Sequence, residues 1–206
     1  MSDVLVPGGR DVRGTLEEPT AEPRAIVVAC PPHPQHGGSR SDQRLRAVSD
    51  ALVEAGIACL RFDYGAWDEG YGEREDVRNA VRWARDEYDG GRGDLPVGLF
   101  GYSFGASLAL LAAAEADPDA VAVLAPTAQL ADDLDALAAL DRIERPTHVL
   151  YGERDTTVDW EQVVERARER GDETTSLPAD HFFLGTRDEI ATAVREYFEQ
   201  TLCEAT

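Results

Sequence analysis

From about residue 25 onward, short apolar runs alternate with amphipathic stretches, and this alternation limits the possible folds more than any other feature of the sequence. The run Ala25–Cys30 is uniformly apolar, as a strand buried on both faces requires, whereas Ser41–Ala55 repeats apolar residues with the period of a helix. Strands that alternate with helices build a mostly parallel sheet covered on both faces. We therefore predict one α/β domain over residues 1–206, with a central sheet of about eight strands flanked by helices.

The positions of the elements follow from the same pattern. Two apolar runs near the start, Val4–Val6 and Asp11–Leu16, have no helix between them and are expected to form an antiparallel pair at the sheet edge. The other strands are expected at Ala25–Cys30, Ile57–Phe62, Pro96–Phe100, Val121–Leu124, Thr147–Tyr151 and Thr174–Leu177. Helices are expected at Ser41–Ala55, Glu73–Tyr88, Ala106–Ala116, Leu130–Leu140, Asp159–Arg170 and Arg187–Leu202, with a turn at Gly90, Gly91 and Gly93.

The pentapeptide Gly-Tyr-Ser-Phe-Gly at 101–105 lies between a predicted strand and a predicted helix. That context is the one in which Gly-x-Ser-x-Gly forms a nucleophile elbow, a sharp turn that exposes the serine hydroxyl. Small residues are needed on either side of the turn, and Gly101 and Gly105 meet that need. The pattern predicts Ser103 as a nucleophile and the Phe104 N–H as a donor to an oxyanion. Read without its context, the pentapeptide is only a glycine-rich turn.

A serine hydroxyl needs a base, and after a nucleophile elbow the acid and the base follow in the order Ser, Asp, His. Asp155 comes just after the predicted strand Thr147–Tyr151, and His181 comes just after the next one. His181 is the only histidine beyond Asp155, so the base has no rival in that order. Three other carboxylates compete for the role of acid. Glu153 is expected to be exposed, Asp159 to be the N-cap of its helix, and Asp180 to be solvated.

The loop after Ala25–Cys30 is expected to supply the second oxyanion donor through its main chain. Pro34 has no N–H, so we predict Gln35 as the donor, with His33 as the alternative. His33 and His36 also suggest a metal site, but they lack a third ligand, and no metal or cofactor is predicted. His148, near the start of a strand, is expected to be structural.

These motifs resemble the small α/β-hydrolases without a cap that are related to dienelactone hydrolase and prolyl oligopeptidase. The resemblance runs through the loop Cys-Pro-Pro-His-Pro-Gln-His-Gly-Gly at 30–38, the segment Arg-Phe-Asp-Tyr at 61–64, the elbow, Asp155 and His181. It implies an α/β-hydrolase fold and hydrolysis of esters or thioesters by a Ser-His-Asp triad. The chain departs from the family in the loop after Phe62, and Ser103 replaces the cysteine nucleophile of dienelactone hydrolases proper.

The segment between Pro126 and Pro146 is too short for a large cap, which predicts an open, shallow site. Aromatic residues are expected to border that site, and each of them could equally belong to the core. The residues expected around the substrate are His33, Tyr64, Trp67, Tyr71, Tyr102, Phe104, Phe182 and Phe183.

Composition excludes several function classes. The chain has 40 acidic and 20 basic residues, a net charge of −20, and every basic residue is an arginine. Such a surface repels phosphate backbones and anionic lipids, which argues against binding to nucleic acid or membranes. No membrane-spanning run or secretory signal is recognisable, and Cys30, Cys59 and Cys203 are too scattered for a disulfide framework or zinc site. We expect a soluble, cytoplasmic protein with buried thiols and small-molecule substrates, of unknown oligomeric state.

Two other functions remain open from the sequence. A peptidase of the prolyl oligopeptidase type would use the same triad, although the chain leaves no room for the gating domain of such enzymes. A binding protein that has the α/β-hydrolase fold but no activity would have little reason to carry Ser103, Asp155 and His181 together in order.

The excess of acidic residues predicts adaptation to high salt. At roughly 1 M salt the Debye length shrinks to about 3 Å, so repulsion between carboxylates is screened. The melting temperature is expected to rise between low and molar KCl, as measured by thermal unfolding across a salt series. A melting temperature that does not rise would show instead an ordinary acidic protein from a GC-rich genome, which also favours arginine.

Overall fold

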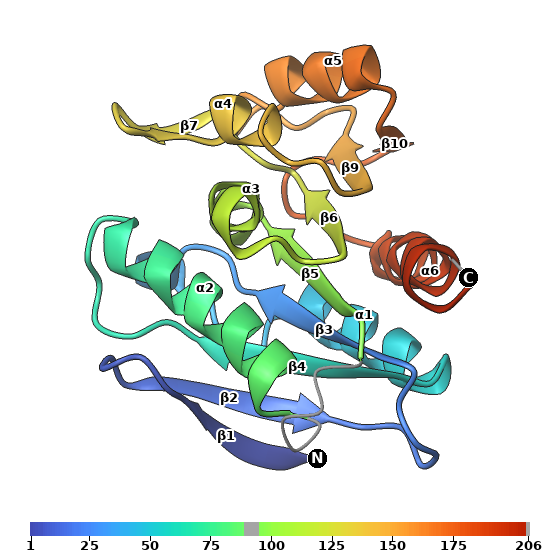
Figure 1. Cartoon of the computed structure of the whole chain (residues 1–206). Coiled ribbons are helices and arrows are strands. Elements are labelled where there is room, and N and C mark those ends of the chain that lie inside the picture. Colours follow the sequence, from blue (N-terminus) through green and yellow to red (C-terminus); the bar gives the residue numbers. More distant parts are fainter. Residues whose placement is uncertain (89–94, 205–206) are drawn as a thin grey trace.

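The central sheet of the computed structural model contains eight strands within the described residues, 1–88 and 95–204 (Figure 1). They run in the order β1-β2-β4-β3-β5-β6-β9-β10. Their bounds are Ser2–Val6 (β1), Val12–Glu17 (β2), Ala25–Cys30 (β3), Ile57–Asp63 (β4), Val97–Tyr102 (β5), Ala120–Leu124 (β6), Thr147–Gly152 (β9) and Glu173–Leu177 (β10). The predicted number of strands is confirmed, and the predicted turn at Gly90, Gly91 and Gly93 lies outside the described residues.

The sheet is mostly parallel, with an antiparallel edge. β1 pairs with β2 and β2 with β4 in antiparallel register, as the absence of helices near the start predicts, whereas all pairings from β4 to β10 are parallel. The chain passes from β3 to β4 and then returns to the other side of β3 to form β5. Such a reversal opens a crevice at the carboxyl ends of the two strands, which is where open α/β sheets place their sites.

Helices cover both faces of the sheet (Figure 1). The helices α1 (Gln43–Glu54) and α6 (Arg187–Phe198) pack together on one face, and a short π-helix at Glu199–Cys203 follows α6. The other face carries α2 (Tyr71–Asp86), α3 (Phe104–Ala116), α4 (Ala136–Leu140) and α5 (Glu161–Arg170). Alternate residues of the buried strands enter two separate hydrophobic clusters, one against each helical layer. This arrangement is the α/β-hydrolase fold without a large cap, as predicted.

Two local predictions are wrong. Residues 130–135, predicted as the start of a helix, instead lie in a small hairpin of β7 (Gln129–Ala131) and β8 (Leu134–Asp135). The helix begins only at Ala136, because the Asp135 carboxylate accepts the Ala138 N–H at 2.8 Å and caps it there. Asp159 is not the N-cap of α5, since that position is taken by Trp160.

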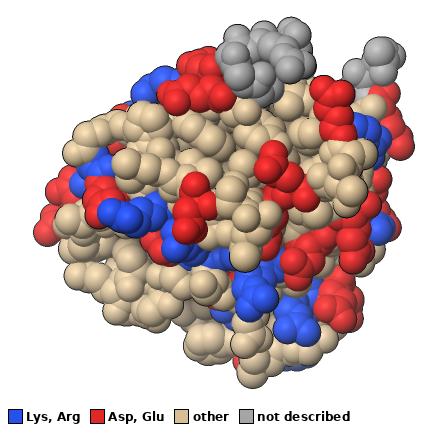
Figure 2. Space-filling model, turned by 90° about the horizontal axis from the view of Figure 1, so that it is seen from below, with Lys and Arg blue, Asp and Glu red and all other residues tan. Residues whose placement is uncertain are grey.

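Arginine side chains lie among the acidic ones on the surface (Figure 2). Arg145 lies 2.7 Å from Asp117, and Arg78 bridges the carboxylates of Glu75 and Glu115. Surface pairs of this kind contribute little each, and even complete pairing would leave the net charge of −20. The acidic side chains therefore remain in large excess over the arginines that pair with them.

Two of the three cysteines are core residues. Cys30 and Cys59 are fully buried and unbridged, whereas Cys203 is only half-buried. Burial raises the pKa of both core thiols, to about 12 for Cys59, so they are unreactive. Among the described residues, no helix has both the length and the apolarity needed to cross a bilayer.

His148 lies in the core between β10 and α6, as a structural residue should. Only 1% of its side chain is exposed, Nε2 is 2.9 Å from Thr175 Oγ1, and its ring lies against that of Tyr197. Burial lowers the pKa of His148 to about 4. The Glu173 carboxylate is 3.8 Å from Nε2 but half exposed, so solvent weakens its attraction for a proton on the ring.

The fold should consequently lose stability as the solution is acidified. The unfolded chain binds a proton on His148 near pH 6.5 and the folded chain only near pH 4, so the stabilising contribution is present above pH 6.5 and is lost below it. A shift of this size removes roughly 2 kcal/mol of unfolding free energy between pH 7 and pH 5. His148→Gln should remove that part of the pH dependence, as measured by denaturant unfolding at both pH values. Equal losses in the variant and the unaltered chain would contradict this assignment.

Candidate active site

The turn between β5 and α3 holds Ser103 in a strained main-chain conformation. Its φ of 56° and ψ of −119° are unusual for a residue with a side chain. A Cβ on Gly101 would lie 2.2 Å from the Gly105 carbonyl oxygen, and one on Gly105 would lie 2.4 Å from the Pro31 carbonyl oxygen. Only glycine fits at these two positions, so the sequence pattern reflects close contact of main chains. The result is a hydroxyl at the carboxyl end of β5 and the start of α3.

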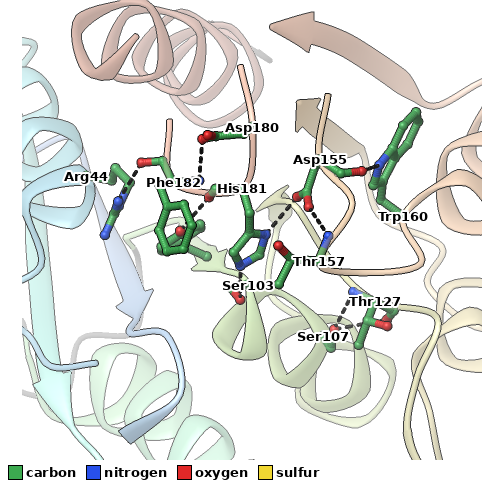
Figure 3. A network of polar contacts seen from close by, with 11 residues as sticks. Arg44, Ser103, Ser107, Thr127, Asp155, Thr157, Trp160, Asp180, His181 and Phe182 are labelled. Carbon is green, nitrogen blue, oxygen red and sulfur yellow. Dashed lines mark hydrogen bonds and ion pairs between the residues drawn. The ribbon is translucent and has the colours of Figure 1, made fainter. Parts of the chain in front are cut away.

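The structure brings Ser103, His181 and Asp155 together (Figure 3). Ser103 Oγ lies 2.9 Å from His181 Nε2, and His181 Nδ1 lies 2.7 Å from Asp155 Oδ2. A carboxylate only accepts hydrogen bonds, so Nδ1–H donates to Asp155 and Nε2 is left to accept the serine proton. Asp155 and His181 are 4% and 8% exposed, which shields their attraction from solvent.

Further contacts hold the Asp155 carboxylate in place. The other carboxylate oxygen, Oδ1, accepts the Thr157 N–H at 2.8 Å. The indole N–H of Trp160 donates to the main-chain carbonyl oxygen of Asp155 at 3.0 Å. The three rival carboxylates, Glu153, Asp159 and Asp180, are all exposed, and Asp180 accepts the Phe182 N–H. Of these acids, only Asp155 contacts the imidazole.

The two predicted oxyanion donors differ in whether their N–H already has a partner within the protein. Phe104 is the first residue of α3, where the N–H has no partner within the helix, so it is available to a ligand beside Ser103. The Gln35 N–H instead donates to His33 Nδ1 at 3.3 Å, because Pro34–His36 forms a 3₁₀ turn that His33 caps. The His33 N–H, the predicted alternative, has no acceptor within residues 1–88 and 95–204. Proline after a capping side chain is the signal in the sequence for that turn.

A cavity of about 570 Å³ opens over Ser103 and His181. His33, Tyr102, Phe104 and Phe182 line it, as predicted. The other lining residues are Pro32, His36, Gly37, Gly38, Asp42, Arg44, Thr127, Leu130, Thr157 and Val158. The wall is mostly uncharged, and its charged side chains, Asp42 and Arg44, bind each other.

Four aromatic residues predicted at the site border do not line the cavity. Tyr64 is buried and donates its hydroxyl to the Pro31 carbonyl at 3.0 Å, and Phe183 is buried against the ring of Tyr102. Trp67 contacts the wall residues His33 and Phe104 rather than the cavity. Tyr71 donates to Asp133 of the turn between β7 and β8. The sequence alone does not show whether an aromatic residue packs in the core or lines the cavity wall.

The His33 and His36 rings stack with centroids 4.4 Å apart, and His33 also contacts Trp67 and Phe104. Burial lowers the pKa of His33, with a further contribution from His36. The described part of the chain contains no cluster of side chains that could hold a metal ion. The two histidines instead lie side by side in the cavity wall.

Sequence reasoning missed several wall residues. Leu130 and Val158 follow β6 and β9, but nothing in the sequence distinguishes them from loop residues elsewhere. Arg44 and Asp42 stand at the start of an amphipathic helix, where charged residues are expected whether or not a site is near.

Residues 41–202 match the family of X-Pro dipeptidyl-peptidases, the S15 family. The chain belongs to the S15 family. The match spans the elbow, Asp155 and His181. A structure from Xanthomonas campestris, described as a serine hydrolase without a lid, has 25% sequence identity and a TM-score of 0.81, covering 100% of this chain and 96% of that one.

Another solved structure, a dienelactone hydrolase from Anabaena variabilis, has 24% identity and a TM-score of 0.79 over 98% of this S15-family chain and 97% of its own. The predicted resemblance to lidless hydrolases related to dienelactone hydrolase is thereby confirmed. A protein of Mycobacterium tuberculosis that is named as a phosphoribosyl transferase is 31% identical over 97% of this chain. The chain spans only 46% of the length of that relative.

The contacts of Asp155 predict that a high kcat requires the negative charge of its carboxylate. Asp155→Asn keeps the shape of the side chain but removes the acceptor that orients Nδ1–H and stabilises the protonated ring, so kcat should fall by roughly 10³- to 10⁴-fold. Glu153→Gln and Asp180→Asn, at the rival positions, are the matched controls and should leave kcat within about threefold, because neither carboxylate contacts the imidazole and Asp180→Asn keeps an oxygen that can accept the Phe182 N–H. The measurement is steady-state ester hydrolysis at pH 7. A larger effect at either control position would reassign the acid.

Proposed function

We propose that this protein hydrolyses carboxylic esters or thioesters of small, uncharged molecules through an acyl-enzyme on Ser103. The observation that carries the proposal is the continuous chain of contacts from Ser103 Oγ through His181 to Asp155 at the floor of an open cavity. A serine hydroxyl bound to a correctly oriented imidazole is an activated nucleophile.

The steps follow from the positions of the groups. Ser103 Oγ attacks the acyl carbon while His181 Nε2 takes its proton, and the oxyanion forms beside the Phe104 N–H at the positive end of α3. Return of that proton to the leaving oxygen or sulfur breaks the bond and leaves the acyl group on Ser103. Water, deprotonated by the same imidazole, then releases the acid and restores the hydroxyl.

The charges of the cavity wall support an uncharged substrate. Asp42 is the one carboxylate that lines the cavity within the described residues, and it holds both Nε and Nη2 of Arg44. Because the two charges already neutralise each other, the wall offers neither a free anion nor a free cation to a charged substrate. The acidic surface adds repulsion against anionic esters at low salt.

A peptidase is the second candidate, and membership of the S15 family favours it. Removal of dipeptides requires a carboxylate that binds the substrate's free amino terminus, since a buried ammonium group needs a partner. Asp42, which is already paired with Arg44, is the one such wall group in the described structure. Ester hydrolysis places no such demand on the wall, which is why we rank it first.

Turnover of p-nitrophenyl acetate and butyrate, compared with turnover of aminoacyl-proline p-nitroanilides that carry a free amino terminus, tests the proposal. We expect ester hydrolysis to be faster in kcat/KM by at least about a hundredfold, because the wall offers no free carboxylate for the ammonium group. A fluorophosphonate probe should attach to Ser103, as mapped by mass spectrometry.

Ser103→Ala should lower ester turnover by at least about 10⁴-fold, and Ser176→Ala, at an exposed serine of β10, is the matched control. Faster cleavage of the anilides would make the peptidase the correct function. Undiminished turnover in Ser103→Ala would exclude the assigned nucleophile and leave the fold as a binding scaffold.

A further inference from the structure

The imidazole of His181 stands on a loop without regular secondary structure. We call residues 178–186, between β10 and α6, the base loop. Phe183 within it has a φ of 51°, a conformation that a phenylalanine avoids unless its surroundings impose it. The distance between the imidazole and Ser103 therefore depends on how firmly the main chain of the base loop is held in place.

Two side chains from other elements hold that main chain by consecutive carbonyl groups. The Tyr102 hydroxyl, at the end of β5, donates to the His181 carbonyl at 2.7 Å. Arg44, on the first turn of α1, donates from Nη1 to the Phe182 carbonyl, also at 2.7 Å (Figure 3). The two bonds fix the main chain at the base itself and at its immediate neighbour.

Arg44 is itself fixed on two sides. The Asp42 carboxylate accepts Nε at 2.9 Å and also binds Nη2, while one of its oxygens caps α1 by accepting the Arg44 N–H at 2.8 Å. The guanidinium carbon lies 4.5 Å from the centre of the Tyr102 ring, within the range of a cation–π contact. The side chain of Arg44 is 20% exposed and that of Asp42 9%, so water competes only weakly for these bonds.

We infer that Arg44, oriented by Asp42, is a positioning residue that holds the base loop so that His181 Nε2 stays within reach of Ser103 Oγ. This inference rests on the proposed hydrolase function. It gives Arg44 a role through the main chain of the loop, without contact to the reacting atoms. Displacement of a base by about 1 Å is enough to lower a rate by about a hundredfold.

The position of Arg44 at the cavity wall allows a different role, recognition of a carboxylate on the substrate. The contacts argue against it, since three of the five guanidinium N–H groups already donate to the protein and the Asp42 carboxylate already neutralises the charge. The two roles differ in what they change, because loss of positioning lowers kcat for every substrate, whereas loss of recognition raises KM for anionic ones alone.

The test uses Arg44→Met, which retains the length of the side chain but removes its donors, and Arg44→Lys, which restores one charged donor. With an uncharged p-nitrophenyl ester, Arg44→Met should lower kcat by roughly ten- to a hundredfold while KM changes by less than about threefold. Fluorophosphonate labelling of Ser103 should slow in parallel. Arg44→Lys should recover part of the loss in both measurements.

Arg46→Met is the matched control, because Arg46 lies on the same helix but is exposed and outside the cavity over Ser103. It should leave kcat unchanged. Tyr102→Phe removes the other tether and keeps the ring under the guanidinium, so it should also lower kcat, and its effect should not add simply to that of Arg44→Met. If Arg44→Met does not fold, Arg44→Lys and Tyr102→Phe decide the question.

Unchanged kcat and labelling in a folded Arg44→Met variant would overturn the inference. So would a rise in KM confined to a p-nitrophenyl ester that bears a carboxylate, which would assign Arg44 to substrate recognition. Either result is compatible with an inactive Ser103→Ala variant and therefore with the proposed function. Full activity in Ser103→Ala is the separate result that would remove the proposed function.

Discussion

Close contact between main chains at the junction of β5 and α3 is the constraint on which the site depends. The carbonyl of Gly105 lies against Gly101, and the carbonyl of Pro31 lies against Gly105, so the strand, the helix and the loop after β3 meet with no space for side chains between them. The strained conformation of Ser103 persists because this packing leaves it no alternative. The hydroxyl, the start of α3 and the loop that carries His33 are thereby placed relative to one another by the main chain alone.

The other half of the site is placed differently. Asp155 and His181 come from loops after β9 and β10, and both depend on side-chain hydrogen bonds for their positions. Tyr102 connects the two halves, since it precedes the nucleophile in the elbow and its hydroxyl reaches the main chain of His181. Tyr102 occupies a variable position of the Gly-x-Ser-x-Gly pattern. Its hydrogen bond thus connects the elbow, which is held by main-chain packing, to the loop that carries His181.

The sequence was most informative where chemistry or sterics admit few residue types. Glycines beside Ser103, and a histidine with no rival after Asp155, were readable because no other residues would serve. For Gln35 the sequence was less informative, because the hydrogen bonds of a short 3₁₀ turn decide which N–H groups have a partner, and these depend on the capping side chain of His33. Tyr64 and Phe183 failed because apolar aromatic residues suit a core and a pocket equally, and only packing decides between them. Arg44 gave no signal, since its pairing with Asp42 is ordinary at the start of a helix and its partners at the site, the Phe182 carbonyl and the Tyr102 ring, are distant in sequence.

Between β6 and β9 the chain forms only the hairpin β7–β8 and the short helix α4, and this segment contributes Thr127 and Leu130 to the cavity wall. This segment therefore places no hinged domain over Ser103, and on the proposed function the acyl group would be held in an open cavity. An acyl group held there would be open to attack by alcohols or amines of the medium as well as by water. The proposed hydrolysis would then be accompanied by transacylation whenever such nucleophiles are abundant.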